Sequence, residues 1–258
     1  MNVYVLFDRW GRMGNRMFQY AFGYLLAEKR NTRFFSNGLP NFNIPDTISV
    51  ENLPQPVNPL YTRGFGDNYI DEHSLRTTSR DVIVNSFVQK ASYYHGYQTK
   101  LREIFNIQQA PVINTGKLVV HIRETDYVGI NKFLGYSFYR KLINDSKFTD
   151  VVIVTDNSDC DTVKRLVSDG CKVNTEGTVR TFDYVSDQRA MNDFNVLLHS
   201  ENIAISQSSF SWWAAFLGNH NKVFLPYKIN GGMWSLEPGP DDIDLYINRP
   251  NSIKYIND

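Results

Sequence analysis

Residues 193–217, DFNVLLHSENIAISQSSFSWWAAFL, predict a helix, a buried strand, a polar turn and a second helix in close succession. Apolar residues fall at helical spacing over about 187–200, and a nearly continuous apolar run marks a strand at 202–206. The polar turn then leads into an apolar helix at 210–218. A strand that is apolar on both faces and flanked by helices is typical of a parallel sheet in an α/β protein.

The same alternation extends outward from this stretch through the second half of the chain. Strands are predicted at 118–122, 151–155 and 223–225, and helices at 136–146 and 159–168. In the first half, strands are predicted at 2–7, at TRFFS and from Asp81, with helices at 15–30 and 97–105. Residues 37–80 are rich in proline and asparagine and predict long loops. We therefore predict two Rossmann-like halves, residues 1–110 and 111–258.

Composition excludes several classes of protein. Lys plus Arg and Asp plus Glu both number 27, so the chain lacks the basic excess of a typical nucleic-acid binder. Cys160 and Cys171 form no CxxC pair and no Cys/His cluster of the kind that binds zinc. No apolar run approaches the roughly 20 residues of a membrane span, and NVYVLF followed by Asp8 and Arg9 is typical of a strand rather than a signal peptide. We expect a cytoplasmic enzyme, and peripheral contact with the inner membrane surface stays open.

Three polar clusters follow predicted strands. They are HIRETDYVG at 121–129, TDN at 155–157 and SQSSFSWW at 206–213. Because ligands of parallel sheets bind beyond the carboxyl ends of the strands, we expect the three clusters to line one rim of one crevice.

The residue types in these clusters suit a nucleoside diphosphate. Arg123 can hold phosphate oxygens through its planar fork of donors, and Ser208 and Ser209 precede a helix whose start favours an anion. Asp156 can accept hydrogen bonds from a guanine or a ribose. Structural roles remain open for each: an N-cap for the serines and for Asp156, and an ion pair between Arg123 and Asp126.

With these residues in place, four segments resemble the bacterial-type α-1,2-fucosyltransferases. Residues 11–27 are similar to the opening segment of that family, 85–105 to its middle segment and 193–217 to its last motif. HIRETDY at 121–127 resembles the H-x-R-x-x-D motif that this family shares with α-1,6- and protein O-fucosyltransferases. The resemblance implies an α/β, GT-B-like fold with two Rossmann-like halves facing a cleft. It also implies an inverting transfer of L-fucose from GDP-β-L-fucose to a galactoside hydroxyl of an oligosaccharide or glycolipid, with no metal or other cofactor.

The resemblance also implies roles for individual residues. Arg123 would be the catalytic residue that stabilises the departing GDP, and the N-terminal half would hold the acceptor. The residues expected to bind the donor are Gly14, Asn15, His121, Arg123, Asp126, Asp156, Ser208, Ser209 and Phe210. One position departs from the family, which often has a second arginine where this chain has Glu124. For the base that accepts the proton of the acceptor hydroxyl, Asp8, Glu72 and Asp126 all remain candidates.

Two other functions remain open. A metal-dependent GT-A glycosyltransferase would use an Asp-x-Asp motif, and the chain has one at Asp159–Asp161 and another at Asp242–Asp244. The first is better explained as a helix start and the second lies in a tail rich in proline and glycine. A non-catalytic sugar-nucleotide binder is the second alternative, for which Glu124 is the best argument. We expect Trp212 and Trp213 to be helix core rather than a sugar platform.

Overall fold

The structure is a computed structural model that describes residues 2–7, 12–47, 60–62, 75, 78–125, 128, 133–174, 188–228, 234 and 243–257. Its chain divides into two compact units. Unit 1 comprises Met1–Ile107 and Pro238–Leu245, and unit 2 comprises Gln108–Glu237 and Tyr246–Asp258. The sequence predicted a single division near residue 110. The structure adds a late segment that returns to unit 1, where the backbone N–H of Ala91 donates to the carbonyl of Asp244 at 2.7 Å.

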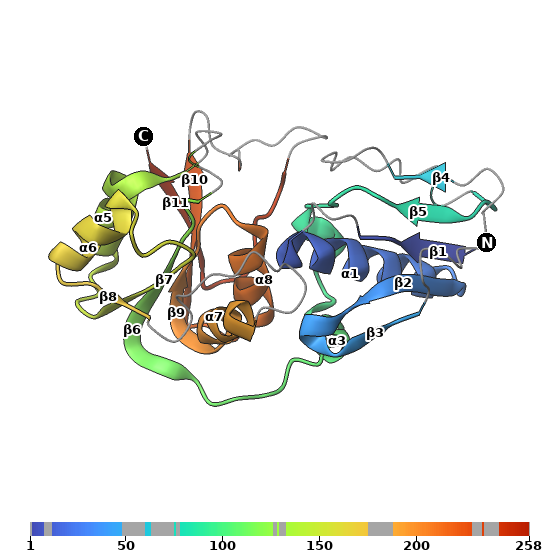
Figure 1. The fold of residues 1–258 in the computed structure, drawn as a ribbon, viewed down its shortest axis with the longest axis horizontal. Helices are drawn as coiled ribbons and strands as arrows, with labels where there is room; N and C mark the ends of the chain where they lie inside the picture. Colours follow the sequence, from blue (N-terminus) through green and yellow to red (C-terminus); the bar gives the residue numbers. More distant parts are fainter. Residues whose placement is uncertain are drawn as a thin grey trace. The chain divides into compact units, whose positions relative to one another are not determined.

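Unit 1 is built on a five-stranded sheet in the order β3-β2-β1-β5-β4. Strand β1 is parallel to β2 and β5, as the predicted Rossmann-like pattern requires. The elements of the unit are β1 (Asn2–Val5), α1 (Met13–Lys29), β2 (Arg33–Leu39), η1 (Pro40–Phe42), β3 (Ile44–Asp46), β4 (Leu60–Tyr61), β5 (Val82–Val84), η3 (Ala91–Tyr93) and α3 (Gln98–Ile104). Helix α1 packs along β1 and β2 (Figure 1). Buried valines of β1 and β5 form the centre of the core.

The segment predicted as loop from residue 37 is partly regular, and in its described part that prediction is wrong. β2 runs to Leu39 and turns back into β3, which pairs with it in antiparallel fashion. Asn43 makes the turn at φ 55°, a left-handed conformation that asparagine adopts more easily than most residues. Gly38 has φ +36°, and a Cβ there would lie 2.4 Å from the carbonyl oxygen of Ile44. The hairpin therefore depends on turn residues that look like loop punctuation in the sequence.

Unit 2 contains a six-stranded, fully parallel sheet in the order β11-β10-β9-β6-β7-β8. Its elements are β6 (Ile113–Ile122), α5 (Gly135–Ser146), β7 (Val151–Thr155), α6 (Asp161–Ser168), β8 (Lys172–Val173), α7 (Gln188–His199), β9 (Ser200–Ala204), α8 (Ser209–Leu217), β10 (Lys222–Lys228) and β11 (Ser252–Asn257). Every helix predicted for this half is present within two residues of its predicted ends.

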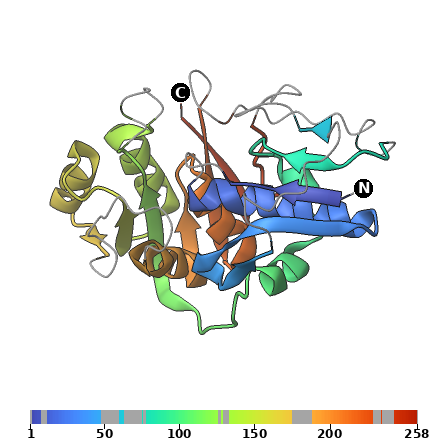
Figure 2. The ribbon, with the colours of Figure 1, turned by 45° about the vertical axis from the view of Figure 1, so that its right-hand side comes forward.

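Helices cover both faces of this sheet. Helices α5 and α6 lie on one face and α7 and α8 on the other (Figure 1), an arrangement that Figure 2 shows from a second angle. Residues at alternating positions of β6, such as Val120 and Ile122, pack with Phe138 and Leu142 of α5 in one core cluster. Because side chains alternate along a strand, His121 faces the other way, towards α8. The end of β6 thus sends successive side chains to opposite faces of the sheet.

Candidate functional site

The order of the strands in unit 2 identifies where a ligand would bind. From β6 the chain proceeds outward through β7 and β8, and from β9 it proceeds in the opposite direction through β10 and β11. The carboxyl ends of β6 and β9 therefore flank a topological switch point, the usual position of a ligand crevice in an open parallel sheet. Two of the predicted polar clusters, those that start at His121 and Ser206, leave the sheet at this point.

His121 joins the two strand ends. Its Nδ1 lies 2.7 Å from Oγ of Ser206, both side chains are buried, and its ring centroid is 5.6 Å from that of Phe210. Burial lowers the pKa of His121 to about 3, Arg123 adds to the lowering, and Asp156 opposes it. The imidazole is therefore neutral at physiological pH, and its contact with Ser206 connects the end of β6 to the end of β9.

Arg123 follows β6 and points towards the start of α8. Its Nη1 donates a hydrogen bond to Oγ of Ser208 at 3.4 Å. Ser208 occupies the N-cap position and is fully buried, yet its side chain makes no capping hydrogen bond. The hydroxyl therefore faces the guanidinium rather than performing the ordinary capping role. A guanidinium beside a helix start combines two features that favour an anion.

Asp156 holds the segment that carries Arg123. Thr125 Oγ1 donates to Asp156 Oδ2, and the backbone N–H of Glu124 lies 3.5 Å from Oδ1. These bonds connect the end of β7 to the residues that follow β6. The carboxylate has a positioning role through Thr125.

Glu124 points to a different part of unit 2 from Arg123. It is 6% exposed, and its Oε1 has no hydrogen-bond partner among the described residues. Glu124 lies against Cys160, at the start of α6. Burial is the main cause that raises the pKa of the Cys160 thiol to about 11, and the nearby Glu124 carboxylate contributes to the rise. Arg123 contacts α8 instead. The acid at this position, where α-1,2-fucosyltransferases often have a second arginine, therefore lies away from the Arg123–Ser208 pair.

In unit 1, Gly14 and Asn15 lie in the first turn of α1, which follows the carboxyl end of β1. Oδ1 of Asn15 accepts a hydrogen bond of 2.8 Å from Nε2 of Gln89, a buried side chain. The sequence did not identify Gln89 as a site residue, although it belongs to the segment 85–105 that resembles the middle segment of the family. Its amide side chain directly after the apolar pair Phe87 and Val88 was the available signal.

The remaining predicted residues divide into three groups. Ser209 and Phe210 begin α8, and Phe210 also packs on Phe194 at 5.6 Å. Trp212 and Trp213 are fully buried, which confirms that they are helix core. Four predicted residues lie outside the described residues: Asp8, Glu72, Asp126 and Asp242.

The first Asp-x-Asp sequence is engaged in surface ion pairs. Asp159 pairs with Lys164 at 3.7 Å and Asp161 with Arg165 at 3.5 Å, and all four side chains are well exposed. Asp244, from the second, forms a backbone bridge with Lys90. No three His, Cys, Asp or Glu side chains gather in a metal-binding group within the described ranges.

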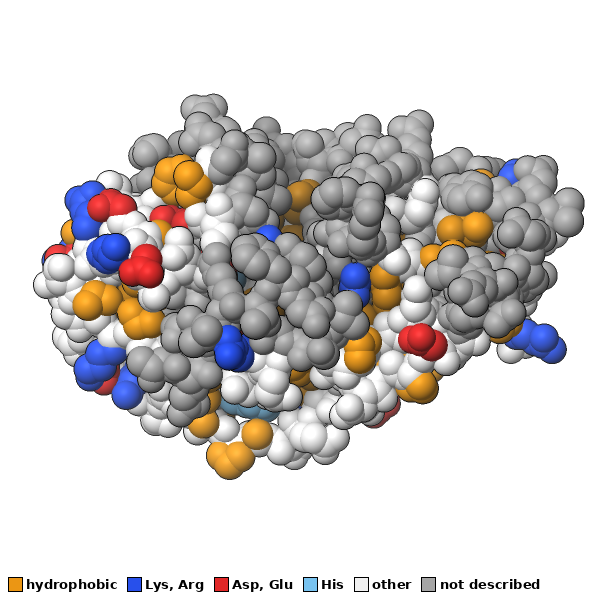
Figure 3. All heavy atoms as spheres, viewed as in Figure 1, with side chains coloured by type: hydrophobic (Ala, Val, Ile, Leu, Met, Phe, Trp, Pro, Cys, Tyr) orange, Lys and Arg blue, Asp and Glu red, His pale blue; other side chains and the backbone are white. Residues whose placement is uncertain are grey.

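The charged surface of unit 2 is mixed in sign. Figure 3 shows cations and anions interspersed over the face that carries α5 and α6, where Arg140 pairs with Asp169 and Lys141 with Asp145. The described helices include none with the length and apolar character needed to cross a bilayer.

Comparisons with known proteins agree with this architecture. No family model matches the sequence. The α-1,2-colitosyltransferase of Escherichia coli is 26% identical over 257 residues, an alignment that covers 82% of this chain and 86% of that protein.

Solved structures show the same fold at low identity. FUT1 of Arabidopsis thaliana, solved as a mutant in complex with GDP, has a TM-score of 0.52 at 13% identity, covering 93% of this chain and 72% of that chain. The α-1,6-fucosyltransferase NodZ from Bradyrhizobium, in crystals soaked with GDP-fucose, has a TM-score of 0.50 at 13% identity. The alignment covers 86% of this chain and 94% of NodZ. The predicted fold class, α/β of the GT-B type, is confirmed. Sequence and fold together relate the chain to glycosyltransferases of the fucosyltransferase and colitosyltransferase type.

Proposed function

We propose that this chain transfers a 6-deoxy-L-galactose unit from a GDP-sugar to a galactoside hydroxyl, with inversion and an α-1,2 linkage. The donor we predict is GDP-β-L-fucose, and the acceptor is an oligosaccharide or glycolipid. The observation that carries the proposal is the position of Arg123, which donates to Ser208 at the start of α8, beside the switch point of a parallel sheet. The likeness to a colitosyltransferase favours a second donor, GDP-colitose, because colitose is fucose without its 3-hydroxyl.

The chemistry that Arg123 can perform follows from the charge of the reaction. Breaking the bond between the sugar and the diphosphate leaves positive charge on the sugar ring and negative charge on GDP. A guanidinium fixed next to a helix start stabilises that negative charge more in the transition state than in the bound donor. Asp156 and Thr125 support this by holding the segment on which Arg123 lies. We propose that the reaction uses no metal and no other cofactor.

The test is an assay of the purified protein with GDP-fucose and GDP-colitose, each with a panel of galactosides. We expect transfer from at least one donor, and NMR of the product to show a new α-linkage at the 2-hydroxyl of galactose. Another linkage would leave the glycosyltransferase in place and overturn the α-1,2 assignment. Binding of GDP with no turnover of either donor would favour the non-catalytic binder instead.

A further inference from the structure

The residue before Gln89 has a strained backbone. Val88 lies shortly after β5, and its φ of 55° places it in the left-handed region. A β-branched residue is rarely found there, because its side chain crowds the backbone. The other non-glycine residues with positive φ in the described part of the chain are asparagines and one lysine, none of them β-branched. Strain of this kind persists only where the surrounding structure imposes it, and it concentrates at functional positions.

Several hydrogen bonds impose this conformation. Oη of Tyr94 lies 2.9 Å from the carbonyl oxygen of Val88, and the backbone N–H of Lys90 donates to the same oxygen at 2.9 Å. The carbonyl of Gln89 accepts a bond of 3.1 Å from the backbone N–H of Asp244, in the late segment that returns to unit 1. The side chain of Val88 is fully buried in the core with the valines of β1 and β5. The main chain at Gln89 is therefore fixed, and so is the direction in which its side chain leaves.

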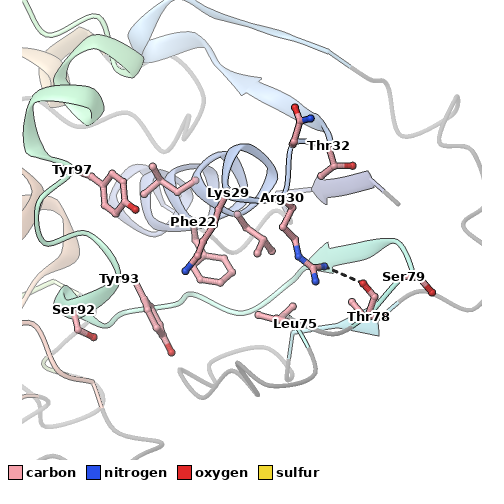
Figure 4. A pocket seen from close by; sticks show the side chains of 13 residues that line it. Phe22, Lys29, Arg30, Thr32, Leu75, Thr78, Ser79, Ser92, Tyr93 and Tyr97 are labelled. Carbon is pink, nitrogen blue, oxygen red and sulfur yellow. Dashed lines mark hydrogen bonds between the residues drawn. The ribbon is translucent and has the colours of Figure 1, made fainter.

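The same segment is aligned along one face of α1. Asn15, Phe18 and Phe22 follow one another at intervals of three and four residues, which places them on one side of the helix. The ring of Phe18 lies 5.3 Å from that of Tyr94, and the ring of Phe22 lies 5.4 Å from that of Tyr93. Phe22 and Tyr93 also line the pocket drawn in Figure 4, over the second half of α1. These two ring contacts hold the segment in register with the helix that carries Asn15.

The side chain of Gln89 meets Asn15 at the start of that face. Nε2 of Gln89 donates to Oδ1 of Asn15 at 2.8 Å, and Gln89 is buried whereas Asn15 is half-buried. The oxygen and the nitrogen of an asparagine amide lie on opposite edges of one plane. A donor held at Oδ1 therefore also determines the direction of the Nδ2 donors, and with it the hydrogen bonds that Asn15 can offer to a ligand.

We infer that Gln89 is a positioning residue for binding of the donor sugar, because it sets the orientation of the Asn15 amide. A neutral amide both donates and accepts hydrogen bonds, as sugar hydroxyls do, whereas the charged diphosphate suits the guanidinium of Arg123. Asn15 then contacts hydroxyl groups of the sugar, and Gln89 acts through Asn15 without touching the ligand. The inference rests on the proposed function, because the ligand is the transferred sugar of a GDP-sugar.

The experiment measures binding of GDP, GDP-fucose and GDP-colitose by calorimetry, without an acceptor. Gln89→Met keeps the length of the side chain and removes its amide. We expect this change to raise the Kd of the GDP-sugar that the native protein binds about fivefold, the scale of one lost hydrogen bond, and to leave the Kd of GDP unchanged. Gln109→Met, at an exposed glutamine of unit 2, is the matched control and should change neither Kd.

Gln89→Glu gives a sharper contrast. A carboxylate cannot donate to Oδ1, so the Asn15 amide has to turn and donate from Nδ2 to the carboxylate instead. Asn15 then presents an acceptor where it presented a donor. We expect weaker binding of the GDP-sugar than in Gln89→Met, without an equal loss for GDP. This variant differs from the native side chain in one group, so it carries the comparison if Gln89→Met does not fold.

A double-mutant cycle separates positioning from general structural support. In an Asn15→Ala background the amide that Gln89 orients is absent, so adding Gln89→Met should change the Kd of the GDP-sugar no further. A purely structural role of Gln89 would instead lower the Tm and weaken GDP and the GDP-sugar alike, with or without Asn15.

Three results would overturn the inference. The first is an unchanged Kd of the GDP-sugar in both Gln89 variants, the second is an equal rise for GDP and the GDP-sugar, and the third is a full effect of Gln89→Met in the Asn15→Ala background. Transfer is assayed separately. Transfer by the native protein together with any of these results defeats the inference alone, whereas the expected binding pattern without any transfer defeats the proposed function and leaves the positioning role standing. A native protein that binds neither GDP-sugar defeats both.

Discussion

Arg123 is the residue on which the proposed chemistry depends most. Replacing it with alanine should lower turnover by at least about 100-fold, the scale for loss of a key charge stabiliser. Arg123→Lys should also have low turnover, because an ammonium group cannot present the planar fork of donors. The measurement is kcat with GDP-fucose or GDP-colitose. Arg140→Ala is the control, since that arginine lies on α5 and pairs with Asp169, which follows α6. If Arg123→Ala keeps more than about a tenth of native activity, Arg123 is not the main stabiliser of the departing GDP.

His121 should make the fold sensitive to acid. Burial lowers its pKa to about 3, so as the pH drops below about 6.5 the unfolded chain binds a proton that the folded chain refuses. Its contribution is complete above pH 6.5 and is lost as the pH falls towards 3. The slope approaches about 1.4 kcal/mol per pH unit for one proton. Burial also lowers the pKa of His220, which adds a slope of the same sign.

Urea unfolding at several pH values between 7.5 and 4.5 tests this expectation. His121→Asn keeps a polar atom near the position of Nδ1 and cannot take up the proton. We expect the variant to be less stable at pH 7.5 and to lose less stability on acidification, because the contribution of His121 is gone while that of His220 remains. Parallel curves for the two proteins would show that His121 is not the group responsible.

Glu124 shows what residue-level prediction lacked. From the sequence, the acid directly after Arg123 was the best argument for a non-catalytic binder. The structure separates the two side chains, because Arg123 reaches Ser208 and Glu124 lies against Cys160. The direction of a side chain just beyond the end of a strand depends on the local backbone geometry. The sequence pattern does not determine that direction.

At the scale of elements, the start of α8 raises the question whether Ser208 caps the helix or helps to bind a ligand. Ser208 makes no side-chain capping bond. Ser208→Ala should therefore lower the free energy of unfolding by less than the ~1 kcal/mol that loss of an N-cap costs. The same change removes the hydroxyl that contacts Arg123 and should weaken GDP binding about fivefold. Thermal unfolding and calorimetry with GDP measure the two effects. A large drop in Tm with unchanged GDP affinity would identify Ser208 as a structural cap.

The helices and inner strands of unit 2 could be predicted because their apolar periodicity is strong. Strand β11 could not, because it is an edge strand in which Ile253 and Ile256 are exposed and Tyr255 is buried. A short edge strand of this kind shows no apolar alternation pointing to one face. The hairpin of β2 and β3 was missed for a related reason. Gly38 in β2 and Asn43 in the turn are residue types that are also typical of irregular loops.

Of the candidate site, the sequence supplied the residues and their common sheet edge, but not their partners. His121, Arg123 and Ser208 lie together because β6 and β9 are neighbours, a pairing that the general rule for parallel sheets anticipates. The contact between Asn15 and Gln89 joins positions far apart in the chain. Amide pairs of this kind leave no periodic pattern, so side-chain partners of this type require coordinates.

For the whole molecule, we predict that activity does not require a divalent metal. Arg123 and the start of α8 can stabilise the diphosphate, and Asp159 and Asp161 already pair with basic side chains on α6. Excess EDTA should leave the rate of transfer nearly unchanged. The double variant Asp159→Ala, Asp161→Ala should keep nearly the same rate of transfer. Its stability should fall little, since exposed ion pairs contribute about 0–1 kcal/mol to the free energy of unfolding. Complete loss in EDTA, restored by manganese or magnesium, would show that a metal ion rather than Arg123 neutralises the departing diphosphate.

The late return of residues 238–245 to unit 1 has a consequence for how the protein is made. A ribosome delivers the chain from its N-terminus at about 5–20 residues per second. Unit 1 receives its last segment, which pairs with the backbone near Ala91, only after nearly all of unit 2 has been synthesised. Strand β11, the edge of the other sheet, emerges later still. Neither half can be finished before these late segments have been synthesised, so a nascent chain that stalls before residue 238 would carry two incomplete domains rather than one complete and one missing.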